Sequence, residues 1–272
     1  MVKSVSVIIP AYNSQATIAT CLQSLSRQSL KPKEIIVVDD GSRDGTAETA
    51  KRFSVRLFRR PHQGPGLSRN FGAHHATGDI LVFVDADMEF DRQFLKFLTR
   101  PISSGKARGT WSGNEWVKNW YHHWARCANF YHWRGSNKMV GESTGQKEVF
   151  RAILKKDFDR AGGFTPTGYT DDWTLADKLG FVPYRTPAKF FHSHPETITK
   201  IFSHAVWVGK RPYKLGSWGA IWAAFRANAV FSLVWGSLKA VRFVEARMVI
   251  YQLVYDLGLL IGALISLTGR RY

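Results

Sequence analysis

The hydrophobic pattern of the first hundred residues alternates between short apolar runs and segments of helical periodicity. The apolar runs predict strands at residues 5–10, 34–38, 55–58 and 80–84. Apolar positions at helical spacing predict helices that end near residue 25 and that cover 47–53 and 67–76. Strands and helices that alternate in this way, joined by loops of ordinary length, favour right-handed βαβ units. We therefore expect an α/β fold with a Rossmann-like, mostly parallel central sheet flanked by helices.

Acidic residues follow two of the predicted strands. Asp85 and Asp87 come directly after the strand at 80–84, and Asp40 follows the strand at 34–38. In open α/β sheets, ligands bind at the carboxyl edge of the strands. Asp85 and Asp87 point the same way while the chain is extended, so both can meet one divalent cation whose other ligands are water and phosphate oxygens. The alternative is that these acids are turn formers at strand ends.

The charge balance adds a prediction about partners. The 272 residues include 38 Lys and Arg against 21 Asp and Glu, a net charge of +17. Such an excess favours an anionic partner, which includes nucleic acid, a phosphorylated substrate and anionic lipid. Two cysteines are too few for a disulfide framework or a cysteine zinc site. No secretory signal opens the sequence, so we expect the N-terminal part to face the cytosol.

Four segments together resemble family 2 glycosyltransferases with the GT-A fold. They are SVIIPAYN at 6–13, VVDDGSRDGT at 37–46, SRNFG at 68–72 and VDAD at 84–87, in the order and spacing of that family. The resemblance implies a glycosyltransferase domain over 1–199, with a nucleotide-binding half at 1–100 and an acceptor-binding half at 101–199. Members of the family move a sugar from a nucleotide diphosphate donor with inversion, usually with Mg²⁺ or Mn²⁺.

The resemblance also implies a donor site. It assigns nucleotide-sugar binding to Pro10, Ala11, Tyr12, Asn13, Asp40, Arg69 and Asp85. Asp40 would accept a hydrogen bond from the base, Tyr12 would stack on it, and Arg69 would contact the base or a phosphate oxygen. Asp87 would be the principal metal ligand, and Asp85 would reach the metal through water or hold the ribose. The plainer alternatives are a capping role for Asp40, core packing for Tyr12 and a solvated helix charge for Arg69.

Residues 169–180 resemble the block in which the family carries its catalytic carboxylate. An inverting transfer in one displacement needs a base that takes the proton of the acceptor hydroxyl, and Asp172 corresponds to that base. Thr174 replaces an acid that is common in the family, which leaves the acceptor type open. Alternatively, the acids here only cap a helix. His194 is a candidate donor or ligand near the diphosphate or metal, and a surface pair with His192 is the alternative.

Residues 200–272 differ in composition from the rest of the chain. They hold ten Lys and Arg against Glu245 and Asp256, a balance of about +8. The apolar stretch 249–267 is near the length that spans a bilayer, about 20 residues, but Asp256 interrupts it. We expect a helical region that spans the membrane or lies on its anionic surface, at the cytoplasmic face of the cell membrane. A soluble helical subdomain or oligomer contact is the alternative.

The predicted activity is that of an inverting glycosyltransferase. It would move a sugar from a nucleotide diphosphate to a hydroxyl of a glycan or lipid-linked acceptor, with cation assistance and Asp172 as base. One alternative is transfer to a polyprenyl phosphate, whose anionic oxygen needs no base. Another is a catalytically inactive scaffold of the same fold. A basic nucleic-acid-binding protein would also suit the net charge, but it leaves the carboxylates at the strand ends unexplained, so we expect no nucleic acid partner.

Overall fold

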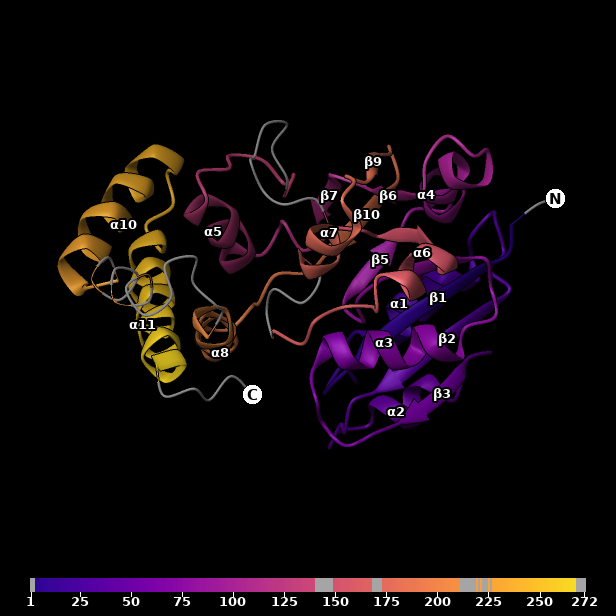
Figure 1. Ribbon diagram of the computed structural model, residues 1–272. Helices are drawn as coiled ribbons and strands as arrows, with labels where there is room; N and C mark the ends of the chain where they lie inside the picture. Colours follow the sequence, from indigo (N-terminus) through magenta and orange to yellow (C-terminus); the bar gives the residue numbers. More distant parts are fainter. Residues whose placement is uncertain are drawn as a thin grey trace. The chain divides into compact units, whose positions relative to one another are not determined.

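The computed structural model describes residues 3–139, 149–167, 173–210, 219, 221, 225 and 227–267. The chain divides into two compact units, which are described separately (Figure 1). Unit 1 takes in Met1–Trp116, Glu142–Pro166 and Asp171–His192. Unit 2 takes in Val117–Gly141, Thr167–Thr170 and Ser193–Tyr272. Unit 2 thus combines a segment from the middle of the chain with the C-terminal region.

The central sheet of unit 1 has the strand order β3-β2-β1-β4-β8-β6-β9 among the described residues. Its strands are β1 (Val5–Ala11), β2 (Glu34–Asp39), β3 (Arg56–Arg59), β4 (Ile80–Phe83), β6 (Gly109–Trp111), β8 (Ala152–Leu154) and β9 (Tyr184–Arg185). β3, β2, β1 and β4 are parallel neighbours, whereas β8 runs antiparallel to both β4 and β6. The predicted α/β fold with a mostly parallel sheet is confirmed.

A smaller sheet and several helices complete unit 1. The smaller sheet has the order β5-β10-β7, with β5 (Met88–Phe90), β10 (Lys189–His192) and β7 (Asn114–Val117). The helices are α1 (Ile18–Ser26), α2 (Thr46–Ala50), α3 (Pro65–His75), α4 (Phe94–Ser103), α6 (Lys155–Arg160) and α7 (Thr174–Leu179). Every strand and helix predicted in the first hundred residues is present, with ends shifted by a few residues.

The residues of β1 alternate between two hydrophobic clusters, one on each face of the sheet. Val7 and Ile9 pack in the cluster that includes Leu22 of α1. Ile8, between them, packs in the opposite cluster with Phe83. A strand covered on both faces needs apolar side chains at consecutive positions, which explains the consecutive apolar residues Val7, Ile8 and Ile9.

Unit 2 is helical in the parts that the structure describes. Its helices are α5 (His123–Tyr131), α8 (Ile198–Gly209), α10 (Ala229–Phe243) and α11 (Met248–Leu267). α11 packs against α8, α10 and α5. Among the described residues, α11 is the one helix long and apolar enough, by length and composition, to cross a membrane. The expected C-terminal helical region with an apolar helix near 249–267 is confirmed.

Gly72 sets the distance between α3 and the centre of the sheet. A Cβ atom at Gly72 would lie 2.6 Å from Cγ2 of Ile8 and 3.3 Å from Cγ2 of Val38. Only a residue without a side chain therefore allows α3 to pack this closely on β1 and β2. This packing matters for function because α3 carries Arg69.

Replacing Gly72 with alanine should destabilise unit 1. Overpacking at a closely packed site costs about 1–3 kcal/mol, which exceeds the gain of about 1 kcal/mol from the higher helix propensity of alanine. We expect a lower urea midpoint for Gly72→Ala in an unfolding titration followed by circular dichroism. The matched control is His74→Ala, an exposed position on the same helix, for which the midpoint should stay within experimental error. Equal midpoints for the two variants would contradict the packing argument.

Candidate active site

The carboxyl ends of β1, β2 and β4 lie side by side at one edge of the sheet. These strands are parallel neighbours, with Ala11 opposite Asp39 and Ile8 opposite Phe83. The segments that follow them begin at Tyr12, Asp40 and Val84, so all three leave the sheet at the same edge. The polar residues predicted from the sequence are concentrated there.

The loop after β1 is fixed to the loop after β2. Pro10 and Ala11 are buried at the end of β1. Asn13 has a left-handed backbone with φ 48°, a conformation that asparagine tolerates better than most residues. Its backbone N–H donates to Oγ of Ser42 at 2.9 Å, and its Oδ1 accepts from the backbone N–H of Arg43 at 3.0 Å. Asn13 therefore positions the loop by joining two strand ends.

Tyr12 lies between the fixed loop and the solvent. Its side chain leaves the residue 44% exposed, and its ring stacks on the His62 ring with 4.1 Å between centroids. Nδ1 of His62 in turn lies 2.8 Å from Oδ2 of Asp40. A partly exposed, oriented aromatic ring is suited to stack on a planar base.

The carboxylate of Asp40 is engaged by its own chain. Its Oδ1 accepts from the backbone N–H of Gln63 at 3.0 Å and from Oγ of Ser68 at 2.9 Å. Its Oδ2 accepts from the backbone N–H of Gly64 at 2.8 Å, beside the contact with His62. An ionised carboxylate has about four acceptor sites, and three of them are used by these donors, whereas Nδ1 of His62 also lies 3.1 Å from the backbone carbonyl oxygen of Asp40. Asp40 thus anchors the start of α3, and base recognition by its side chain stays a prediction.

Asp85 is held between two arginines. Its Oδ1 lies 2.7 Å from Nη2 of Arg69, and its Oδ2 lies 3.3 Å from Nη1 of Arg151. Both arginine side chains are largely buried, 10% and 14% exposed. Burial opposes the charge on Asp85, but the two guanidinium groups outweigh it and hold the pKa of Asp85 well below its usual range. Asp85 therefore stays ionised and fixes two cationic groups at the sheet edge.

Asp87 is the open carboxylate of the pair. Its side chain is 53% exposed, and its Oδ1 lies 3.3 Å from Nε2 of His192. Nδ1 of His192 contacts the Glu115 carboxylate on the other side of the ring. Burial of the ring opposes its charge, but Asp87 and Glu115 prevail and raise the pKa of His192 well above its usual range. The two carboxylates therefore favour the protonated form of the imidazole.

The sequence analysis did not single out Arg151 and Glu115, and it favoured His194 over His192. The missing information was the direction of the short strands. β8 runs antiparallel to β4, so the start of β8, next to Arg151, lies beside the carboxyl end of β4. β10 runs antiparallel to β5, so the end of β10, at His192, lies beside the start of β5. His192 lies opposite Met88, the residue after Asp87. Arg151 directly precedes the apolar residues of β8, and His192 follows the two phenylalanines of β10. A polar residue next to a short apolar run is therefore the sequence signal that could have identified both.

Two predicted site residues, His194 and Asp172, are not among the residues described above at the sheet edge. His194 belongs to unit 2, where its backbone N–H donates to Oδ1 of Asn119 at 3.0 Å. Its Nε2 lies 3.2 Å from Oδ1 of Asn129. Asp172 lies outside the described residues, which resume at Trp173 immediately before α7.

The side chains at the edge can hold a divalent cation only together with oxygen atoms of a bound phosphate and of water. No group of three or more His, Cys, Asp and Glu side chains among the described residues is placed to hold a metal ion. Both oxygens of Asp85 face arginines, which leaves the exposed Asp87 carboxylate and the His192 imidazole as available donors. Carboxylate, imidazole, phosphate and water oxygens suit Mn²⁺ or Mg²⁺. A cation here would displace the proton of His192 and take its remaining ligands from a bound phosphate and water.

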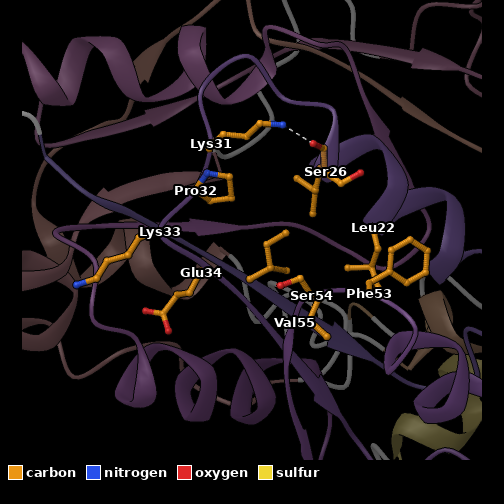
Figure 2. A pocket seen from close by; sticks show the side chains of 11 residues that line it. Leu22, Ser26, Lys31, Pro32, Lys33, Glu34, Phe53, Ser54 and Val55 are labelled. Carbon is orange, nitrogen blue, oxygen red and sulfur yellow. Dashed lines mark hydrogen bonds between the residues drawn. The ribbon is translucent and has the colours of Figure 1, made fainter.

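A separate hollow of about 220 Å³ opens at the other end of β2 (Figure 2). Its lining includes Leu22 of α1, Phe53 and Glu34, the first residue of β2. Burial opposes the charge on Glu34, but hydrogen bonds from Thr77, Ser6 and Arg56 lower its pKa to about 2. Because Asp40 follows the opposite end of β2, this hollow is not part of the acidic edge.

This chain is similar in sequence and in structure to known proteins. Glycosyltransferase AglE of Haloferax volcanii is 41% identical over 158 residues, which cover 55% of this chain and 50% of AglE. Staphylococcus aureus TarS 1–349 in complex with UDP-GlcNAc has a similar structure, with a TM-score of 0.55, 17% identity, and coverage of 90% of this chain and 74% of the TarS 1–349 chain. GpgS of Mycobacterium tuberculosis, in complex with Mn²⁺, UDP and glucosyl-3-phosphoglycerate, has a TM-score of 0.51, 22% identity, and coverage of 74% and 75%.

These comparisons define the fold and the family. The structural similarity identifies the α/β architecture as GT-A-like, as predicted. The matched segments span between 26% and 50% of the length of three curated relatives. The model of the Glycosyl transferase family 2 matches residues 6–164, which is more than half of the chain. The chain therefore belongs to glycosyl transferase family 2.

Proposed function

We propose that this chain transfers a sugar from a uridine diphosphate donor to an acceptor, with Mn²⁺ or Mg²⁺ bound at Asp87. The observation that carries the proposal is the open carboxylate of Asp87 beside the arginine-bound Asp85, at the carboxyl edge of β4. Family membership supports sugar transfer. The complexes of TarS with UDP-GlcNAc and of GpgS with Mn²⁺ and UDP support the choice of donor and cation.

The charge balance at the edge supports the proposed cation. Around Asp85 and Asp87, the carboxylates of Asp85, Asp87 and Glu115 lie beside Arg69, Arg151 and His192, and the carboxylate of Asp40 lies at the same edge. Without a cation the site is close to neutral and offers a diphosphate little net attraction. When bound, a divalent cation neutralises the departing diphosphate and so stabilises the transition state.

The side chains at the edge then have separable roles. Asp85 holds the guanidinium groups of Arg69 and Arg151 in place. These groups can donate charge-assisted hydrogen bonds to phosphate oxygens. Tyr12 offers its ring to the base. Asp40 positions the start of α3 and, through that helix, Arg69. These residues bind and orient the donor, and Asp87 and His192 would hold the cation.

Asp172 is proposed as the base of an inverting single displacement. A carboxylate that takes the proton of the acceptor hydroxyl as the glycosidic bond forms contributes about 10²–10⁴-fold to the rate. The proposed acceptor is a hydroxyl of a glycan or of a lipid-linked molecule. The proposed location is the cytoplasmic face of the cell membrane, which rests on the basic and apolar composition of residues 200–272.

Nucleotide binding should depend on the cation and on Asp87. In a thermal-shift screen of UDP, GDP, CDP and TDP, we expect UDP to stabilise the protein with Mn²⁺ and to have little effect without it. A ligand at a hundred times its Kd adds about 2.7 kcal/mol of stability. Asp87→Asn should abolish the Mn²⁺-dependent shift.

The matched control for this screen is Glu48→Gln. Glu48 is a surface carboxylate of α2 with 58% exposure, close to the 53% of Asp87, and the change removes the same charge. Its shift should equal that of the unmodified protein. A UDP shift that needs no cation, or that Asp87→Asn leaves intact, would count against the proposed cation site.

The role of Asp172 is tested by Asp172→Asn, with its neighbour Asp171→Asn as control. With the UDP-sugar that binds best, we expect Asp172→Asn to lower the rate of UDP release by about 10²–10⁴-fold. The Mn²⁺-dependent binding of UDP should be unchanged. Asp171→Asn should have a much smaller effect on rate. Activity that survives Asp172→Asn would favour an acceptor that needs no base, such as a polyprenyl phosphate.

A further inference from the structure

Helix α10 is inverted in polarity relative to a helix of a water-soluble protein. Its buried residues are Ser232, Gly236 and Lys239. Its large apolar residues are exposed instead, and these are Val230, Phe231, Leu233, Val234, Trp235, Leu238 and Val241, with exposures from 43% to 81%. Water-soluble helices bury the apolar face and expose the polar one. The surface of α10 therefore suits an apolar surrounding.

The width of this apolar surface indicates what surrounds it. At 100° per residue, the exposed apolar side chains of α10 cover roughly 200° of the helix circumference. An amphipathic helix of a water-soluble protein has an apolar stripe of about 100° or more that faces the core, whereas in α10 the face that points inward carries Ser232, Gly236 and Lys239. An apolar surface that continues around the helix is expected where the medium itself is apolar, as in the hydrocarbon layer of a bilayer.

Helix α11 differs from α10, because its buried face includes the apolar residues Met248, Tyr251 and Tyr255, but it too exposes aliphatic side chains. Ile250, Leu257 and Leu264, at intervals of seven residues, form an exposed aliphatic stripe. The buried face of α11 includes Gln252 and Asp256. With 20 residues the helix is about 30 Å long, which equals the thickness of the hydrocarbon layer, about 30 Å.

Small residues allow α11 to pack closely on α8. A Cβ atom at Gly258 would lie 2.6 Å from Cβ of Ala205, and one at Gly262 would lie 2.2 Å from the carbonyl oxygen of Val206. Gly209 of α8 likewise approaches the carbonyl oxygen of Leu259. Glycines four residues apart at a helix contact are typical of helix packing in membranes, where lipid gives helices no hydrophobic reason to associate.

The charged residues Asp256 and Lys239 inside the helices are hydrogen-bonded to neutral polar groups of unit 2. Asp256 accepts from the hydroxyl of Tyr131 at 2.7 Å, from Oγ of Ser232 at 2.7 Å and from Nε2 of Gln252 at 2.8 Å. Nζ of Lys239 donates to Oε1 of Gln252 and to the carbonyl oxygen of Tyr131, both at 2.8 Å. Asp256 is therefore not a charge exposed in mid-helix, and its presence does not prevent burial of α11 in lipid.

Charged groups that do reach the surface gather at the turn between α10 and α11. Arg242 is exposed in the last turn of α10. Glu245 pairs with Arg126 of α5 at 3.0 Å and with Arg247 at 3.2 Å. A turn that carries arginines at one end of an apolar hairpin fits the headgroup region of a bilayer.

We propose that the α10–α11 hairpin is embedded in the hydrocarbon layer of a lipid bilayer, with the turn at Arg242–Arg247 among the headgroups. The outer surfaces of both helices contact acyl chains, and the hydrogen bonds among Tyr131, Lys239 and Asp256 hold the hairpin together from inside. The family match ends at residue 164, so this hairpin lies beyond the matched segment, and the proposal is independent of the donor and acceptor.

The test is co-flotation of the full chain with phosphatidylcholine vesicles, with and without phosphatidylglycerol. We expect binding to both kinds of vesicle, and we expect it to survive concentrated sodium chloride and an alkaline carbonate wash, because apolar burial and not charge holds the protein. Binding that requires phosphatidylglycerol and is lost in salt would overturn the proposal, since it would show surface attachment only. A detergent-free protein that stays a soluble monomer or dimer by light scattering and does not float would also overturn it.

A pair of matched variants locates the lipid contact. Val234→Glu changes an outward valine of α10 that is 52% exposed, and Val182→Glu makes the same change in unit 1 at a valine that is 78% exposed. We expect Val234→Glu to lower the ratio of vesicle-bound to free protein by about a hundredfold, and Val182→Glu to leave it unchanged. Helix content by circular dichroism in detergent should match in the two variants. Equal flotation of the two would overturn the proposed contact.

Discussion

The parallel pairing of β1 with β2 and β4 is the constraint on which the candidate site depends. Each strand is buried on both faces, so the chain can present polar residues only where a strand ends. Because the three strands run in the same direction, their carboxyl ends share one edge. Residues separated by many positions in the sequence, from Tyr12 to Asp87, are therefore delivered to the same place by backbone hydrogen bonds and not by contacts of their own.

Three aspartates at this edge differ in how much of their hydrogen-bonding capacity is used inside the protein. Asp40 is 3% exposed, and its two oxygens accept three hydrogen bonds from Gln63, Gly64 and Ser68. Asp85 has an arginine at each oxygen but keeps a 30% exposed side chain. Within the part of the chain that the structure describes, the ion-pair partner of Asp87 is His192, and half of the Asp87 side chain faces solvent. The exposed part of the carboxylate that a ligand can reach is therefore smallest for Asp40 and largest for Asp87.

The sequence predicted the parallel half of the sheet well and the remainder of the site poorly. Strands β1, β2 and β4 are rich in consecutive apolar residues, and the acids that follow β2 and β4 mark the shared edge. Strands β8 and β10 have three and four residues, too few for a pattern that fixes their direction. Their antiparallel direction is what brings Arg151 and His192 to the acids, so neither position could be derived from spacing.

The C-terminal helices illustrate a different limit of sequence patterns. Composition predicted an apolar, basic region and left the meaning of Asp256 open. The structure shows which side chains are buried. Asp256 and Lys239 point inward to hydrogen-bond partners, whereas Val234 and Leu257 point outward. A count of apolar residues cannot distinguish these two faces, since both arrangements have the same composition.

The central claim is that the edge at Asp87 and His192 holds a cation and a diphosphate together. The most direct measurement is electron spin echo spectroscopy of Mn²⁺ bound to the protein with UDP. We predict coupling of the Mn²⁺ spin to phosphorus of UDP and to a nitrogen nucleus, with the nitrogen coupling lost in His192→Gln and the phosphorus coupling kept. Mn²⁺ that couples to neither nucleus, or a nitrogen coupling that persists in His192→Gln, would contradict the account.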